Sequence, residues 1–188
     1  MHMSCEMSQG KEVAMTLPSV MLNRLGITED GLAGLLIQDV HEIFSTMIGM
    51  EDTKNTPVPI EPVNLFRNGI TAMVGMVGTY NGIVSLHGSR PLACKMTSEI
   101  LDVPVTEVNE NVLDAIGEIA NMITGSFKMH LSTGGLDIRI STPSVVTGDE
   151  YIISMHGTHD TLTLLYDIDN EWLIVSVAIE REEQPSPA

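Results

Sequence analysis

Cysteine and positive charge are scarce in this sequence, and each scarcity excludes a class of protein. Cys5 and Cys94 are the only two cysteines among 188 residues, and they lie far apart. Such a pair offers neither a disulfide framework nor a thiolate metal site, so we interpret Cys94 as a small buried side chain. Nine basic residues stand against 25 acidic ones, giving a formal net charge of −16. Because nucleic acids and anionic membranes bind clustered Lys and Arg, we exclude both as ligands.

Long apolar runs are also missing. No segment approaches the roughly 20 apolar residues that cross a bilayer, and the N-terminus lacks the basic and apolar regions of a secretory signal. We therefore expect a soluble, cytoplasmic protein. The apolar fraction of 43% suits a globular fold, and the length suits one domain, which we place at 18–180. A disordered tail at 1–17 and a solvated tail at 181–188 are expected to flank it.

The most informative feature of the sequence is a strongly amphipathic helix. We predict that it starts near Thr106 or Asn109 and ends near His130. At about 100° per residue, one apolar stripe gathers Val112, Ala115, Ile116, Ile119, Met122 and Ile123. The opposite face holds Asp114, Gly117, Glu118, Asn121 and Gly125.

The polar face of this helix carries a carboxylate and a carboxamide three residues apart. Residues at that spacing are neighbours on a helix surface, so Glu118 and Asn121 present their polar ends side by side. Glycine inside a helix costs about 1 kcal/mol relative to alanine. Gly117 and Gly125 beside the pair therefore suggest bare backbone that a partner surface approaches, with Asp114 on the same face. Taken alone, exposed Glu and Asn would indicate only an ordinary solvated helix face.

A longer match to a known protein family favours a functional role for this polar pair. The segment Gly117–Gly125, Gly-Glu-Ile-Ala-Asn-Met-Ile-Thr-Gly, resembles the active-site helix of the CheX and CheC phosphatases of bacterial chemotaxis. Ser141–Gly148 resembles the strand and turn that follow this helix in that family. The resemblance is closest to CheX and extends from about Gly31 to about Ile179. These phosphatases hydrolyse the aspartyl phosphate of the response regulator CheY.

The resemblance implies a mechanism for the polar pair. A response regulator neutralises its own aspartyl phosphate with Mg²⁺ and a lysine, so no cofactor or metal of this chain is required. The missing element is an aligned water, and a carboxamide such as that of Asn121 can hold one through its donor and acceptor. Glu118 lies on a solvent-facing helix, which gives no reason for general-base behaviour. The resemblance implies instead that Glu118 pairs with the regulator's lysine.

The remaining pattern predicts an α/β domain of the α+β type, an antiparallel sheet with two long helices packed on it. Helices are expected at 31–49 and 90–101, and a proline-rich loop or extended segment at 51–62. Strands are expected at 70–77, 83–87, 136–146, 150–154, 161–166 and 172–179. Asn81-Gly82 is a hairpin signal between the first two strands.

A short internal sequence similarity points to a pseudo-duplicated CheC/CheX-like fold. Glu42 to Gly49 aligns with Glu118 to Gly125 at Glu, Ile and Gly, although helical patterning alone could give such agreement. The first copy has Ser45 in place of Asn121 and His41 in place of Gly117. We therefore interpret the first helix as structural, which resembles CheX with its single Glu-x-x-Asn rather than CheC with two.

The remaining expectations concern partners and alternative functions. The resemblance implies a phosphorylated CheY-like receiver domain as substrate and a homodimer as the assembly. The main alternative is a non-catalytic module that binds a regulator, or one related to the flagellar switch proteins FliY and FliM. A metal-binding domain would rest on His156, His159 and Asp160, which are more consistent with a polar loop between strands.

Overall fold

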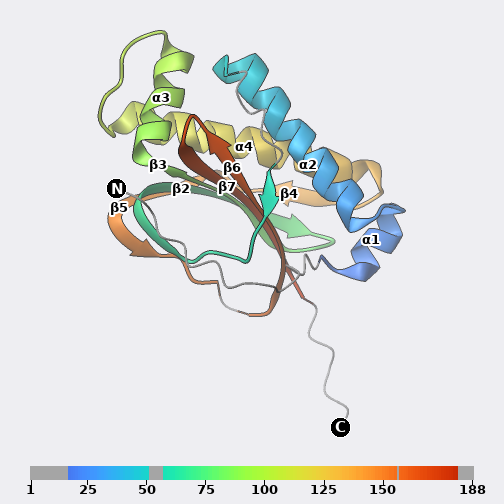
Figure 1. Cartoon of the computed structure of the whole chain (residues 1–188). Coiled ribbons are helices and arrows are strands. Elements are labelled where there is room, and N and C mark those ends of the chain that lie inside the picture. The colour runs from blue at the N-terminus through green and yellow to red at the C-terminus, as the bar shows by residue number, and fades with distance from the viewer. Residues whose placement is uncertain (1–16, 51–56, 156, 182–188) are drawn as a thin grey trace.

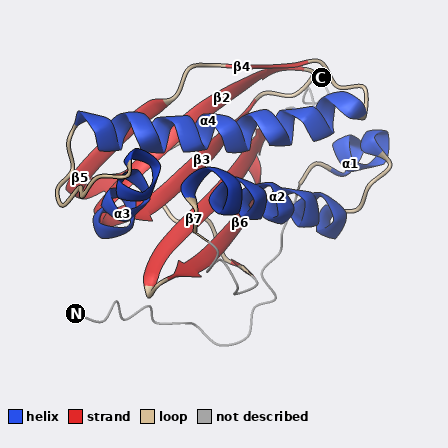
Figure 2. Cartoon of the chain, turned by 90° about the horizontal axis from the view of Figure 1, so that it is seen from above, coloured by secondary structure: helices blue, strands red, loops and turns tan. Residues whose placement is uncertain are grey.

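The computed structural model describes residues 17–50, 57–155 and 157–181. Its α-helices are Ser19–Leu25 (α1), Glu29–Ile43 (α2), Arg90–Leu101 (α3) and Glu110–Thr133 (α4), and a π-helical turn, Phe44–Ile48 (η1), follows α2. Its strands are Val58–Pro59 (β1), Leu65–Gly78 (β2), Gly82–Ser89 (β3), Ile138–Ile140 (β4), Ser144–Ile152 (β5), His159–Ile168 (β6) and Glu171–Glu180 (β7). All seven strands form one antiparallel sheet, and α2, α3 and α4 cover one face of it (Figures 1 and 2). The predicted α+β fold is confirmed.

The sheet order is β1-β6-β7-β3-β2-β4, with β5 also paired to β2. Strand β2 is long enough to pair with two strands along one edge. Met76–Gly78 pair with β4, whereas Leu65–Met73 pair with β5. The prediction of one strand over 136–146 is therefore wrong. The break falls at Pro143, which has no N–H to donate to the ladder and so interrupts strand pairing.

The core lies between this sheet and the helices. Alternate residues of β2, from Ile70 to Met76, point toward the helices and are buried, as the period of two along a strand requires. On α4 the predicted apolar stripe supplies Val112, Ile116, Ile119 and Ile123, all of them buried. Helices α2 and α4 lie side by side on the sheet (Figure 2). Burial of this stripe therefore determines which face of α4 is exposed to solvent.

Local signals set the helix ends. Asn109 caps α4 by accepting a hydrogen bond from the backbone N–H of Val112, so the later of the two predicted starts is correct. Helix α3 spans the predicted residues, with Ser89 as its cap. The predicted helix over 31–49 divides into α2 and η1 and ends at Gly49, whose φ of 75° suits glycine. The short α1 was not predicted.

The predicted tails and the proline-rich segment are described only in part. Residues 1–16, 51–56 and 182–188 lie outside the described residues. Leu17, placed in the expected N-terminal tail, is instead buried, and its N–H donates to the Glu29 carboxylate. Arg181, placed in the other tail, forms an ion pair with Asp160. No helix in the described ranges is both long enough and apolar enough to span a membrane.

Candidate functional site

Helix α4 carries the polar pair on its outer side. Glu118 is exposed and Asn121 is half-buried, one turn apart, where the ends of their side chains can meet the same external group. Within the described parts of the chain, neither side chain has a hydrogen bond or an ion pair. Both therefore keep their full bonding capacity for a partner or for water.

Four of the five predicted residues form one row along α4. Asp114, Glu118, Asn121 and Gly125 follow each other at spacings of four, three and four, which places them along one side of the helix. Asp114 is exposed one turn before Glu118, and the two carboxylates make this end of the row acidic. At Gly125 a Cβ atom would meet nothing within 4 Å. This part of the row is open, as the sequence predicts.

Gly117 corrects the prediction of bare backbone on both sides of the pair. It is buried, because the connection between β4 and β5 packs against it. A Cβ on Gly117 would lie 3.4 Å from Pro143 Cγ and 3.4 Å from Val145 Cγ2. Its missing side chain therefore allows close packing inside the protein and offers little surface to a partner.

The sequence alone gives no reason to place the β4–β5 connection at the site. Ser141–Gly148 resembled a family segment, but no local pattern indicates which part of the helix it contacts. In the structure Pro143 lies against α4 at Gly117, one turn before Asn121. Ser141, Thr142 and Ser144 beside it are exposed. The surface around Asn121 thus includes this connection as well as the helix.

The aligned segment of the first helix has a different local structure. The Ser45 hydroxyl donates to the backbone oxygen of Glu42 at 3.1 Å, and the Thr46 hydroxyl donates to the same oxygen at 2.6 Å. Both residues belong to the π-helical turn η1 rather than to a regular α-helix. The hydroxyl aligned with the carboxamide of Asn121 is therefore bonded to its own backbone.

For the phosphatase activity that the sequence resemblance implies, Glu42→Ala should leave turnover nearly unchanged, because this copy of the motif has no carboxamide and the Ser45 and Thr46 hydroxyls are bonded to the Glu42 backbone oxygen. The measurement is the rate of phosphate loss from a phosphorylated receiver domain, with Glu118→Ala as the matched variant on α4. A loss with Glu42→Ala as large as that with Glu118→Ala would demonstrate a second working site.

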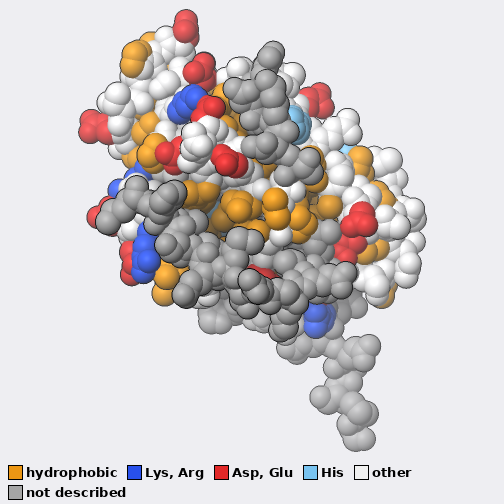
Figure 3. Space-filling view, in the orientation of Figure 1, with side chains coloured by type: hydrophobic (Ala, Val, Ile, Leu, Met, Phe, Trp, Pro, Cys, Tyr) orange, Lys and Arg blue, Asp and Glu red, His pale blue; other side chains and the backbone are white. Residues whose placement is uncertain are grey.

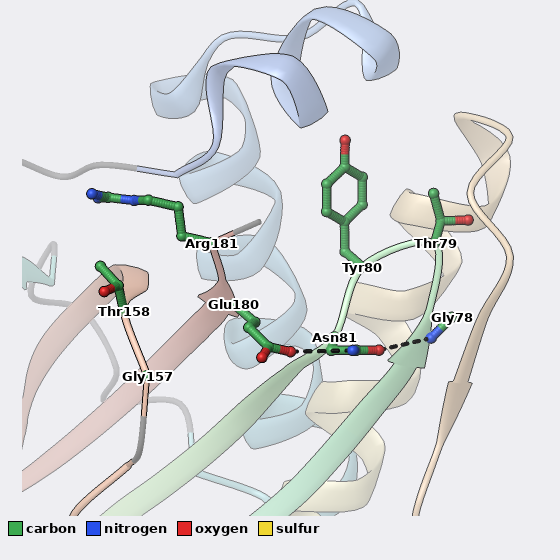
Figure 4. Close-up of a pocket in the computed structure, with 8 residues that line it drawn as sticks. All are labelled: Gly78, Thr79, Tyr80, Asn81, Gly157, Thr158, Glu180 and Arg181. Carbon is green, nitrogen blue, oxygen red and sulfur yellow. Dashed lines mark hydrogen bonds between the residues drawn. The ribbon is translucent and has the colours of Figure 1, made fainter. Parts of the chain in front are cut away.

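A cavity of about 430 Å³ lies at the turn between β2 and β3, away from the polar row. Its described lining residues are Gly78, Thr79, Tyr80, Asn81, Gly157, Thr158, Glu180 and Arg181 (Figure 4). The Asn81 carboxamide donates to the Glu180 carboxylate at 3.1 Å and accepts from the Gly78 N–H at 3.4 Å. Arg181 is paired with Asp160. These polar groups bond to one another, so the cavity offers few unpaired groups to a ligand.

A second hollow, of about 550 Å³, lies beside the start of α4. It is lined by Asn68, Arg90, Pro91, Cys94, Thr106, Glu107, Val108 and Thr147. Arg90 is already bonded to Asp149 at 2.8 Å. Cys94 is buried, as predicted, and burial raises the pKa of its thiol, which disfavours the reactive thiolate.

The charged side chains of the described residues do not gather into an alternative site on the face in Figure 3. On the face shown in Figure 3, the described basic side chains lie at separate points, and the acidic ones are scattered between them. No cluster of three or more His, Cys, Asp or Glu side chains among the described residues could hold a metal ion. Of the histidines considered for a metal, His159 lies at the start of β6, and His156 lies outside the described residues.

Comparisons with known proteins point to one family. The profile described as chemotaxis phosphatase CheX matches residues 70–166, just over half of the chain, including Glu118, Asn121 and Pro143. The CheY-P phosphatase CheX of Thermotoga maritima is 27% identical over 127 residues, covering 67% of this chain and 81% of that protein.

Solved structures agree with the sequence match. The crystal structure of the chemotaxis protein CheX from Vibrio vulnificus superimposes with a TM-score of 0.67 at 25% identity, covering 79% of this chain and 96% of that one. CheX in the CheX–CheY–BeF₃–Mg²⁺ complex from Borrelia burgdorferi has a TM-score of 0.66 at 17% identity, covering 80% and 98%. The second likeness concerns the fold alone.

Proposed function

The chain belongs to the CheX family, and from that premise we propose that it is a cytoplasmic phosphatase that hydrolyses the aspartyl phosphate of a CheY-like response regulator. One observation carries the proposal. Within the described residues the side chains of Glu118 and Asn121 have no hydrogen bond or ion pair, and they lie one turn apart on α4, inside the segment that the family profile matches. The Thermotoga relative is named for the same reaction.

Asn121 is assigned to the attacking water. Phosphoryl transfer leaves a protein little covalent chemistry to perform, so catalysis depends on positioning and electrostatics. The carboxamide has a donor and an acceptor, which lets it hold a water in line with the phosphorus. Its half-buried position restricts the directions in which the side chain can point. An oriented carboxamide supports this role better than a freely moving one.

Glu118 is assigned to binding. Its carboxylate is exposed, and within the described residues no cation is paired with it. It is therefore free to pair with the lysine of the regulator's active site, which would bring the outer side of α4 against the phosphoryl group. Asp114 and Gly125 extend the same row and are proposed to contact the regulator around this pair.

The metal chemistry is assigned to the regulator. The solved Borrelia complex contains CheX, CheY, BeF₃ and Mg²⁺ together. We propose that Mg²⁺ enters the reaction bound to the phosphorylated partner and neutralises charge on the transferring group. The carboxylate and carboxamide of this chain then act beside the ion rather than as its binding site.

The direct test uses phosphorylated CheY-like receiver domains from the same genome. The protein should accelerate loss of phosphate from one of them in the presence of Mg²⁺. A parallel binding measurement with the beryllofluoride-loaded receiver separates recognition from hydrolysis. Binding without acceleration would replace this proposal with the non-catalytic regulator-binding module.

We also predict that the protein is a homodimer. Strand β5 pairs with β2 on one side, and no strand in the described part of the chain pairs with its other side. An open strand edge tends to pair with another chain, and a two-fold arrangement protects both edges. Sedimentation at micromolar concentration should give about twice the mass of the 20.4 kDa chain. A 20.4 kDa species that persists as concentration rises would rule out the dimer.

A further inference from the structure

The connection between β4 and β5 is fixed to the sheet by one residue. Ser141 donates its N–H to the Gly75 backbone oxygen at 2.9 Å, and its hydroxyl oxygen accepts from the Gly75 N–H at 3.0 Å. The same hydroxyl donates to the Thr142 backbone oxygen at 2.8 Å. A side chain thus replaces one ladder bond at the break in strand pairing, and it also shapes the turn that follows.

The next part of the connection lies against α4. Pro143 Cγ and Val145 Cγ2 are both 3.4 Å from the position that a Cβ on Gly117 would occupy. This is the lower end of ordinary van der Waals contact, so a methyl group would just fit there and a longer side chain would push the helix away. The proline ring is itself stiff, because its φ is fixed. The contact therefore helps the buried stripe to hold α4 at its distance from this edge of the sheet.

Asn121 lies one turn beyond this contact. Residues four apart share a helix face, so the contact at Gly117 fixes the part of α4 from which Asn121 projects. Glu118 projects about 100° around the helix from Gly117 and is exposed. The two members of the pair should consequently respond differently when the contact is disturbed.

From these contacts we propose that the segment Ser141–Pro143, packed on Gly117, is a positioning element for Asn121. It holds the carboxamide where the attacking water must be aligned, and it sets turnover rather than affinity for the regulator. This inference rests on the proposed phosphatase function and deepens it. Displacement of a catalytic group by about 1 Å can cost about 100-fold in rate, so a small change in this contact is enough.

Gly117→Leu tests the contact from the helix side. It should lower kcat for dephosphorylation by about 10-fold to 100-fold while KM changes by less than about 2-fold. Affinity for the beryllofluoride-loaded receiver should also stay within about 2-fold, since the exposed Glu118 side chain projects away from the contact and can still reach the receiver's lysine. Gly34→Leu is the matched control, because Gly34 is an exposed glycine of α2 where a Cβ would meet nothing within 4 Å. It should keep wild-type kinetics.

Ser141 tests the connection from the sheet side with smaller changes. Ser141→Ala removes the hydroxyl that bonds Gly75 and Thr142 and should lower kcat, whereas Ser141→Thr keeps a hydroxyl and should restore it. If circular dichroism shows that Gly117→Leu does not fold, these two Ser141 variants still test the positioning role. A role in folding alone would lower the melting temperature of Ser141→Ala without changing kcat of the folded protein.

The outcomes separate this inference from the function on which it rests. Unchanged kcat in folded Gly117→Leu or in Ser141→Ala would overturn the positioning role. A rise in KM at constant kcat would also overturn it, by making the connection a docking surface. Both results require an active wild-type protein. If the wild-type protein does not accelerate dephosphorylation, the phosphatase proposal fails first and the positioning role fails with it.

Discussion

Replacing Asn121 by alanine should abolish the acceleration of receiver dephosphorylation. The assigned role is to align the attacking water, and loss of that alignment is expected to cost about 100-fold or more in kcat. The position is half-buried on the outer side of α4 and makes no hydrogen bond within the described residues. The free energy of unfolding should therefore change by no more than about 0.5 kcal/mol.

Single-turnover loss of phosphate, followed with excess protein at a saturating concentration, measures this effect without a contribution from substrate binding. Glu118→Ala is the contrasting variant, because its predicted defect lies in affinity for the beryllofluoride-loaded receiver and in KM. Wild-type turnover in Asn121→Ala would show that the assigned mechanism is wrong. Loss of binding in Asn121→Ala, with turnover kept at saturation, would exchange the roles of the two residues.

Acidification should destabilise the fold through His87. This side chain lies on β3, is only 4% exposed, and stacks on Phe66 with ring centroids 4.3 Å apart. Its Nδ1 lies 2.9 Å from the Thr71 hydroxyl, and burial lowers its pKa from 6.5 to about 4. The buried ring is thus held in its neutral form at neutral pH.

The direction of the pH effect depends on whether the folded or the unfolded chain takes up the proton first as the pH falls. The folded-state pKa of His87 is below its unfolded-state value, so the unfolded chain takes up a proton while the folded chain does not. The free energy of unfolding is unaffected by this group above about pH 6.5, and it falls as the pH drops to about 4. The total loss at this residue amounts to about 3 kcal/mol.

Urea unfolding at pH 7 and pH 4 measures the change. His87→Phe should show a smaller fall in stability between the two pH values than the wild-type protein, because the new ring can stack on Phe66 and cannot titrate. His159→Gln, at the start of β6, controls for loss of a histidine elsewhere and should retain most of the wild-type fall. An equal fall in His87→Phe and wild type would assign the pH dependence to other groups.

The sequence alone determined the features that depend on neighbouring residues. The apolar period of α4 and the Asn109 cap predict the helix, and the spacing of Glu118 and Asn121 places both on its outer side. Asn81-Gly82 predicts the hairpin between β2 and β3, and the structure confirms the hairpin, although Gly82 already belongs to β3 and pairs with Met76. These predictions succeed because the backbone geometry of a helix or a tight turn is local, so a few adjacent residues specify it.

Only the tertiary structure determined which segments pack around Glu118 and Asn121. The sequence predicts Gly117 as open surface, yet Pro143 covers it, and the strand expected over 136–146 is broken at that same proline. Period and spacing identify which side of a helix faces the core, but not which distant segment packs along its edge. That choice follows from how β2 shares one edge between two strands, and it is made only when residues far apart in the sequence pack together.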